Sequence, residues 1–160
     1  MADRAHVVTV SDRVSAQQMT DESGPALVEI LKLLGFEVSG PEVIPDEKER
    51  IAGAIIAAAE GGAALVATTG GTGLGPRDVT PQATAPLLDY EVPGLGEAMR
   101  RAGASSTPMS AISRSLAGVR GRTLIINVPG SRRGASESLE AVAAVLPHAV
   151  RLLRGETSHP

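Results

Sequence analysis

A glycine-rich segment near the middle of the chain carries the first chemical signal. Residues 68–80 read TTGGTGLGPRDVT. Glycine lets the backbone approach a ligand closely and reach positive φ, and backbone N–H groups exposed in this way bind phosphate oxygens. We therefore interpret the segment as a phosphate-binding loop. Its expected ligand contacts are Thr69, Gly70, Gly71, Thr72, Gly73 and Gly75.

The segment matches neither of two common nucleotide-binding motifs. A Walker A motif would continue with Gly-Lys-Ser/Thr, and a dinucleotide fingerprint would have a third glycine where Pro76 stands. The alternative is a flexible surface loop without a ligand. The charged pair Arg77-Asp78 and the defined exit Thr80-Pro81 argue against it, because a slack loop needs neither. We expect Thr80 to cap a short helix and Pro81 to occupy its first helical position.

Two aspartates are candidates for catalysis and for metal binding. Asp46 and Asp78 both lie close to the ends of predicted strands, so we expect their carboxylates near the loop. Mg²⁺ prefers oxygen ligands and usually keeps waters and substrate phosphates in its shell, and it neutralises the charge of a triphosphate during in-line attack. Each aspartate also has a structural alternative. For Asp46 it is a helix N-cap after Pro45, and for Asp78 it is an ion pair with Arg77 or a hydrogen bond within its own turn.

Polar residues also follow the first and last predicted strands. Ser11 and Asp12 end the first strand, where either could contact a phosphate or a ribose; the alternative for Asp12 is a hydrogen bond that starts the loop. The last strand runs into NVPGS and then a helix, and the N-terminus of a helix favours anions. The alternative there is a plain strand-to-helix turn. Arg132 and Arg133 follow it, either near a phosphate or in solvent. The expected contacts at this corner are Asn127, Gly130 and Ser131.

Apolar runs between these segments predict the elements that position them. Strands are predicted at 5–10, 36–44, 63–67 and 122–128, and helices at 25–34, 46–60, 93–104 and 136–153, with a short helix from 80 and one or two helical turns within 110–118. Gly40-Pro41 marks the second strand as bent or at an edge. The alternation predicts an α/β fold, a three-layer sandwich with a mostly parallel central sheet and helices on both faces. Ligands bind such sheets at the carboxyl ends of the strands, where the polar segments converge.

Composition excludes several function classes. A chain of 160 residues predicts one domain over 1–160, with a frayed tail at 155–160. A net charge of −3 gives no basic surface for nucleic acid, and one Tyr, one Phe and no Trp argue against base stacking. Without cysteine there is neither a disulfide nor a thiolate metal site. No apolar stretch is long enough to span a membrane. We therefore expect a cytoplasmic protein that binds neither nucleic acid nor membranes.

Seven sequence blocks, taken in order, carry a family resemblance. They are VTVSDR (8–13), SGPAL (23–27), VIPDE (43–47), TTGGTGLGPRDVTP (68–81), PGLGEAMR (93–100), ISRSLAGVRG (112–121) and LIINVPGS (124–131). In this order the chain resembles the Mog/MoaB family of molybdenum-cofactor biosynthesis proteins over about residues 7–153. One glycine loop alone would be a weak signal, whereas seven ordered blocks are a specific one.

The resemblance implies a molybdopterin adenylyltransferase, with Mg²⁺ as cofactor and ATP and molybdopterin as substrates. In that reaction the terminal phosphate of molybdopterin attacks the α-phosphorus of ATP, and pyrophosphate leaves. By motif position, Asp46 and Asp78 match the family's acidic residues for catalysis and metal binding, and the glycines of 70–75 match the loop at the phosphates. Ser113 and Asn127 match the ligands on the pterin side.

Two positions depart from the family's usual pattern. Relatives usually have Thr-Pro-Glu after the loop, where this chain has Gln82, and commonly have Pro where it has Arg132. Neither change removes Asp46 or Asp78, so catalysis is the leading interpretation. The alternatives are a non-catalytic MoaB-like protein that binds molybdopterin or a partner, and a different nucleotide-dependent transferase on the same fold. The resemblance further implies a homotrimer, with a hexamer as the alternative, and makes the molybdate-inserting enzyme a candidate partner.

Overall fold

A single mixed sheet organises the molecule. The computed structural model describes residues 1–158, in which six strands are ordered β2-β1-β3-β6-β5-β4. The strands are β1 (Arg4–Val10), β2 (Glu37–Ile44), β3 (Leu65–Thr69), β4 (Tyr90–Glu91), β5 (Ala117–Arg120) and β6 (Thr123–Val128). β2, β1, β3 and β6 are parallel neighbours, whereas the β6–β5 and β5–β4 pairs are antiparallel. The predicted mostly parallel sheet is confirmed.

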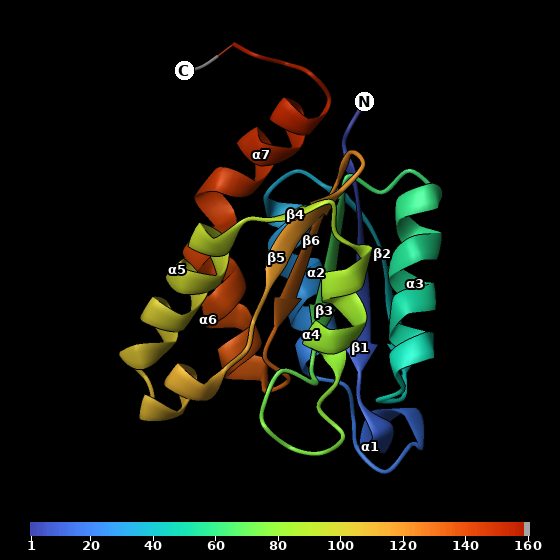
Figure 1. Cartoon of the computed structure of the whole chain (residues 1–160), viewed down its shortest axis with the longest axis vertical. Helices are drawn as coiled ribbons and strands as arrows, with labels where there is room; N and C mark the ends of the chain where they lie inside the picture. The colour runs from blue at the N-terminus through green and yellow to red at the C-terminus, as the bar shows by residue number, and fades with distance from the viewer. Residues whose placement is uncertain (159–160) are drawn as a thin grey trace.

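Helices cover both faces of this sheet (Figure 1). They are α1 (Asp12–Ser15), α2 (Ser23–Leu33), α3 (Lys48–Glu60), α4 (Thr80–Thr84), α5 (Pro93–Ala104), α6 (Arg132–Val142) and α7 (Leu146–Leu153), with the 3-10 turns η1 (Ala85–Leu87), η2 (Pro108–Ile112) and η3 (Ala143–Val145). One face packs against α2, α5, α6 and α7, and the other against α3 and α4. The predicted three-layer sandwich is confirmed.

Periodic apolar residues explain why these layers form. Leu27 and Leu31 of α2, and Ile51 and Ile55 of α3, recur at four-residue spacing and are fully buried. Burying one such side chain stabilises a fold by about 1.5–3 kcal/mol. All residues of β3 and β6 are buried, as expected for central parallel strands covered on both faces. The core therefore holds the carboxyl ends of these strands in fixed positions.

Two strands were missed because their local pattern is weak. The prediction of helical turns within 110–118 holds for η2 but is wrong for the end of that range, where Ala117 and Gly118 belong to β5. β4 has two residues and β5 has four, too few to show alternation. A Cβ at Gly118 would meet the Leu88 side chain and lie 2.7 Å from the Tyr90 carbonyl oxygen, so the glycine lets β5 approach both Leu88 and the backbone of β4 closely.

The C-terminal helix also differs from the prediction of one helix over 136–153. Helix α6 begins at Arg132, because the Ser131 Oγ accepts the Gly134 N–H at 3.0 Å as an N-cap. The turn η3 then separates α6 from α7, which has a proline in its first turn, where the missing N–H costs no hydrogen bond. The prediction of a bent or edge strand is confirmed for β2, which lies at the sheet edge and shifts register against β1.

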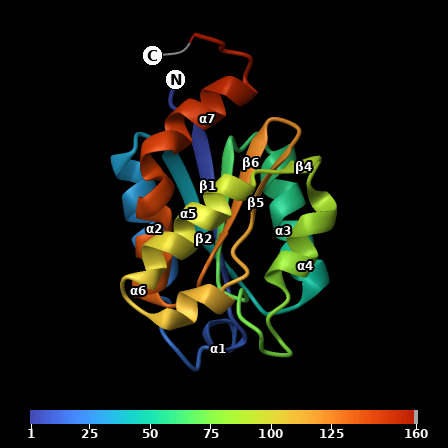
Figure 2. The same cartoon turned by 60° about the vertical axis from the view of Figure 1, so that its left-hand side comes forward.

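The two ends of the sheet have different roles. The N-terminus and helix α7 lie at one end, whereas α1 and the glycine-rich loop lie at the other, which holds the carboxyl ends of the parallel strands (Figure 2). Of the tail predicted at 155–160, residues 156–158 have no regular structure and residues 159–160 lie outside the described part. Within the described residues, no helix is long and apolar enough to cross a membrane.

Candidate active site

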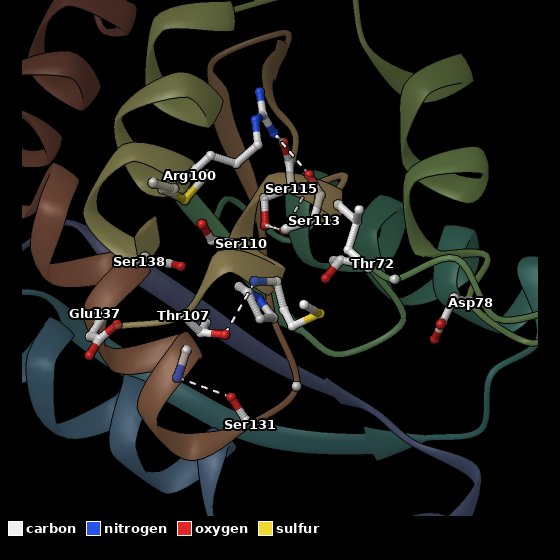
Figure 3. Close-up of a pocket in the computed structure, with 18 of the residues that line it drawn as sticks. Thr72, Asp78, Arg100, Thr107, Ser110, Ser113, Ser115, Ser131, Glu137 and Ser138 are labelled. Atoms are coloured by element: carbon white, nitrogen blue, oxygen red, sulfur yellow. Dashed lines mark hydrogen bonds between the residues drawn. The ribbon is translucent and has the colours of Figure 1, made fainter. Parts of the chain in front are cut away.

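Two cavities meet at the carboxyl end of the parallel strands. The large cavity, of about 730 Å³, lies between the end of β1, α1, the start of α2 and the glycine-rich loop. The small cavity, of about 430 Å³, lies between the same loop, α5, η2 and the start of α6 (Figure 3). Residues that line both are Gly71, Asp78, Gly130 and Ser131. The cavities therefore form one cleft with two lobes, and Asp78 lies at their junction.

The glycine-rich loop needs glycine at its start. Gly70 and Gly71 have φ values of +104° and +71°. A Cβ at Gly70 would lie 2.1 Å from the Val10 carbonyl oxygen, and one at Gly71 would lie 2.3 Å from the Thr80 Oγ1. The first turn of the loop is thus packed directly on β1 and on the start of α4, and its shape is defined rather than slack. The interpretation as an unstructured surface loop is not supported by this packing.

Thr80 anchors the loop instead of capping a helix. Its Oγ1 donates to the Gly70 carbonyl oxygen at 2.9 Å and its N–H donates to the Gly71 carbonyl oxygen at 3.1 Å. The N-cap position of α4 is Val79, without a side-chain hydrogen bond. The predicted cap is therefore wrong, because the fully buried hydroxyl finds its acceptor in the loop. Because α4 begins at Thr80, Pro81 lies at the second helical position, one residue beyond the predicted first position but still in the first turn.

Asp46 bonds across the sheet edge rather than to its own helix. Its Oδ2 accepts the Asp12 N–H at 2.8 Å, and the Asp12 Oδ1 accepts the Asp46 N–H at 3.0 Å. Helix α3 begins after Asp46, with Glu47 at its N-cap, so the alternative of an Asp46 N-cap is wrong. Asp12 also binds the Nε and Nη2 of Arg77, both at 2.9 Å. Arg77 thus pairs with Asp12 and not with Asp78, the partner considered from the sequence.

The surroundings shift the pKa values of Asp46 and Asp12 in opposite directions. Burial raises the pKa of Asp46, and the nearby charges of Asp12 and Asp78 raise it further, against the effect of the Asp12 N–H. The hydrogen bond from Arg77 lowers the pKa of Asp12. A bound cation would therefore favour the ionised form of Asp46 against the effect of burial, whereas Asp12 already has Arg77 as its partner.

Asp78 closes a tight turn within the loop. Its Oδ2 accepts the Gly75 N–H at 2.9 Å, and its own N–H donates to the Gly75 carbonyl oxygen at 3.0 Å. The turn hydrogen bond considered from the sequence is therefore present. It engages one carboxylate oxygen while Asp78 lines both cavities. Together with Asp46, which lines the large cavity, it offers two carboxylates to a cation.

The donor set fits a magnesium ion that shares its shell with a substrate. Within residues 1–158 no group of three or more His, Asp or Glu residues is placed to hold a metal ion. Two carboxylates alone make an incomplete shell for Mg²⁺, which is completed in many phosphate-transfer sites by waters and substrate phosphates. Asp46 and Asp78 could therefore hold Mg²⁺ only together with such ligands.

The small cavity combines apolar side chains with hydroxyl groups. Met109 and Ile112 of η2 line it and are 61% and 49% exposed, so they offer apolar surface to a ligand in the cavity. Hydroxyl groups project around them from three segments; they belong to Thr72, Thr107, Ser110, Ser113, Ser115, Ser131 and Ser138 (Figure 3). The Ser113 and Ser115 Oγ atoms are 3.0 Å apart. A flat ring with polar edges suits such walls.

The remaining predicted residues divide between cavity wall and core. Ser11 lines the large cavity and its Oγ caps α1 by accepting the Val14 N–H. Thr69 lines the same cavity, and its hydroxyl donates to the Pro129 carbonyl oxygen at 2.7 Å. Asn127 is fully buried, and its Nδ2 donates to the hydroxyl oxygens of Thr68 and Thr84. Among the described residues that line the two cavities, neither Asn127 nor Gly75 occurs.

Two residues at the site were missed in the sequence. Glu137 lines the small cavity, where hydrogen bonds from Ser106 and Arg133 lower the pKa of its carboxyl. Arg114 donates hydrogen bonds into the glycine-rich loop. Glu137 stands in an ordinary helical pattern that gives no signal. Arg114 follows Ser113 in the ISR block, which was the only available hint.

Known proteins share this fold and sequence. Residues 6–148 match the model of a family described as a probable molybdopterin binding domain. The crystal structure of the molybdopterin biosynthesis enzyme MoaB from Thermus thermophilus is similar with a TM-score of 0.89 and 51% identity, covering 96% of this chain and 97% of that chain. A molybdopterin adenylyltransferase of Helicobacter pylori is 40% identical over 152 residues, or 93% of this chain and 86% of that protein.

A longer relative has the same region as one part of its chain. The molybdenum cofactor biosynthesis bifunctional protein of Synechococcus elongatus is 44% identical over 151 residues, which cover 94% of this chain. The match covers 47% of that protein, so the chain spans about half the length of this relative. The family match covers most of the chain, and the fold and the ordered motifs agree with it. The chain belongs to the Mog/MoaB family of molybdopterin-binding domains.

Proposed function

We propose that the protein is a molybdopterin adenylyltransferase, which transfers AMP from ATP to the terminal phosphate of molybdopterin. The observation that carries the proposal is the cleft with two lobes that meet at Asp78. Its relative in Helicobacter pylori bears the name of this activity. A reaction that joins two substrates needs two adjacent sites and a shared reaction centre, and the cleft offers that arrangement.

The chemistry of the walls supports one assignment of the two lobes. The small cavity, with the apolar Met109 and Ile112 among hydroxyl groups, suits the pterin ring. The large cavity has Arg13 and Arg132 in its walls, which would attract the phosphates of ATP. Its acidic residues Asp21, Glu22, Asp46 and Asp78 would need a cation between them and the triphosphate. A phosphate oxygen of molybdopterin would attack the α-phosphorus near Asp78. The bond from that phosphorus to the bridging oxygen would break, and pyrophosphate would leave toward the large cavity.

The proposal includes Mg²⁺ held by Asp46 and Asp78. Carboxylate oxygens are suitable ligands, and the raised pKa of Asp46 indicates a place where a cation would be favourable. Bound there, the ion would neutralise charge on the triphosphate. The backbone N–H groups of the glycine-rich loop would bind phosphate oxygens beside it.

We also propose a homotrimer in the cytoplasm, as the family resemblance implies. Large apolar side chains exposed away from the cleft are consistent with contacts between copies, for example Leu33 at 89% and Tyr90 at 56% exposure. Sedimentation equilibrium tests this proposal: a mass of three chains is expected, six chains would indicate the hexamer, and one chain would contradict both. Whether the molybdate-inserting enzyme binds the protein is tested by the same method with the two proteins mixed.

Pyrophosphate release tests the activity. The protein is mixed with molybdopterin, ATP and Mg²⁺, and pyrophosphate and adenylylated molybdopterin are measured together. Both are expected in equal amounts, and neither when Mg²⁺ is chelated or molybdopterin is left out. If the folded protein binds molybdopterin but releases no pyrophosphate, it is the binding-only relative and the proposal is wrong.

A further inference from the structure

One arginine connects three points of the glycine-rich segment. The Arg114 Nε donates to the Gly73 carbonyl oxygen at 2.9 Å, Nη2 to the Asp78 carbonyl oxygen at 2.8 Å, and Nη1 to the Gln82 Oε1 at 2.9 Å. Its backbone N–H donates to the Thr72 carbonyl oxygen at 2.9 Å. The four acceptors span residues 72–82, so one residue holds both sides of the loop that carries Asp78.

The segment that carries Arg114 is itself held in place. Arg100 of α5 donates from Nη1 to the Ser115 carbonyl oxygen at 2.7 Å. The Ser113 Oγ accepts the Ser115 N–H. Arg114 therefore belongs to a segment that hydrogen bonds hold in place, and its guanidinium bonds from there to the loop. These bonds can restrict the movement of Asp78.

The charge of Arg114 has no acidic partner among the described residues. Its three side-chain acceptors are two carbonyl oxygens and the neutral amide oxygen of Gln82, and none of the ion pairs within residues 1–158 includes it. The residue is half-buried. The Gln82 amide is neutral, so it accepts a hydrogen bond from Arg114 without neutralising the guanidinium. In this chain a full positive charge is left beside the loop.

We propose that Arg114 is a positioning residue for the transfer reaction and that the neutral Gln82 leaves its positive charge unpaired beside the loop, where it attracts anionic substrates through space. Arg114 acts through the carbonyl groups of Gly73 and Asp78, and it holds the turn in which Asp78 faces both lobes. The proposal deepens the proposed function and rests on it for its kinetic part. Its structural part concerns the free protein alone.

Two substitutions separate geometry from charge. Arg114→Lys keeps the charge, but a single ammonium cannot bridge three acceptors that a planar guanidinium reaches at once. Gln82→Glu keeps an acceptor at the same place but pairs the charge with a carboxylate. Arg101→Lys is the matched control, because Arg101 is exposed on the neighbouring helix α5.

Hydrogen exchange of the loop amides and steady-state kinetics together test the proposal. Arg114→Lys is expected to speed exchange of the amides of residues 73–80 about tenfold or more and to lower kcat about 10–100-fold with a smaller change in KM. Gln82→Glu is expected to leave exchange unchanged or slower, to keep kcat within about twofold and to raise the KM for ATP about threefold or more. Arg101→Lys should change none of these.

The outcomes separate failure of this proposal from failure of the activity. Loop exchange and kcat at wild-type values in Arg114→Lys overturn the positioning role, as does faster exchange with an unchanged kcat. An unchanged KM for ATP in Gln82→Glu overturns the role of the charge. If the wild-type protein shows no turnover, the proposed function fails, and exchange in Arg114→Lys still decides whether the loop depends on Arg114. Should Arg114→Lys fail to fold, Gln82→Ala removes one contact and should speed exchange about threefold.

Discussion

The two lobes of the cleft are built from different halves of the chain and differ in chemistry. The small cavity is walled mainly by α5, η2 and α6, where Met109, Ile112 and many hydroxyl groups face it. The large cavity is walled mainly by the end of β1, α1 and the start of α2, and the charged residues that line it include Arg13, Asp21 and Asp46. The small cavity favours an apolar ring with polar edges, and the large cavity favours a charged ligand.

Because the two lobes differ, the reaction between the two substrates should depend more on the glycine-rich loop than on either lobe. The loop borders both cavities, and Asp78 is the only carboxylate among the described residues that lines both. A residue in one lobe should therefore affect one substrate, whereas a residue at the junction should affect the reaction between them. The predictions below test this division, beginning with the largest expected effect.

Asp78→Asn should stop the transfer while both substrates still bind. The amide has the size of the carboxylate and can still accept the Gly75 N–H, but it loses the charge that would hold Mg²⁺. Pyrophosphate release is expected to fall by about a hundredfold or more. Calorimetric titration should show the affinity for molybdopterin nearly unchanged. A variant with more than a tenth of wild-type activity would contradict the role assigned to the junction.

Asp46→Asn should lower activity and yet not lower stability. We expect pyrophosphate release to fall about 30–100-fold, because one of the two proposed Mg²⁺ ligands is lost. The folded-state pKa of Asp46 is raised, so its ionisation costs stability as pH rises through that value. Without divalent metal the variant should therefore melt no lower than the wild type at pH 7, and any advantage should disappear below pH 3. A clearly lower melting temperature of the variant at pH 7 would contradict the inference that the ionised Asp46 carboxylate destabilises the folded protein.

Ser113→Ala tests the small cavity alone. Removing one hydroxyl that would contact the pterin should raise the KM for molybdopterin about 3–10-fold. The KM for ATP should stay within about twofold of the wild-type value. Competition titrations with each substrate distinguish the two, and a change confined to ATP would reverse the assignment of the lobes.

Arg132→Ala is the matching change in the large cavity, with the smallest expected effect. Arg132 is exposed, so its attraction for a triphosphate is partly screened by solvent. The KM for ATP should rise about 2–5-fold at low salt, and the difference should shrink at high ionic strength. The KM for molybdopterin should not change. An effect that is independent of salt would mean that Arg132 acts by packing rather than by charge.

Much of the fold was predictable because its determinants are local. The β-branched runs of β1, β3 and β6 and the apolar stripes of α2 and α3 each act within one segment, and the structure confirms them. The two-residue strand β4 and the four-residue strand β5 carry no such pattern. Their pairing depends on β6 being already in place, so it could not be predicted from their own residues.

The candidate site was predictable at the level of segments and less so at the level of bonds. The loop, Asp46 and Asp78 lie together at the carboxyl ends of the parallel strands, as the predicted alternation of strands and helices implies. The partner of Arg77 did not follow from sequence proximity: it bonds to Asp12, 65 residues away, rather than to the adjacent Asp78. Arg77 is exposed, and its guanidinium bonds to a carboxylate that the fold brings beside it from a distant segment. Adjacency in the sequence does not decide which acceptor lies in the right direction.

The sequence by itself determined the α/β class, the family and the segments that form the cleft, because periodicity, glycine placement and ordered motifs are properties of the chain. Only the tertiary structure decided that Thr80 and Arg114 hold the loop, that Asp46 and Asp12 bond to each other, and that two lobes meet at Asp78. The reason is physical. Hydrogen bonds and cavities depend on distances between segments far apart in sequence, and those distances exist only once the sheet has brought the strand ends together.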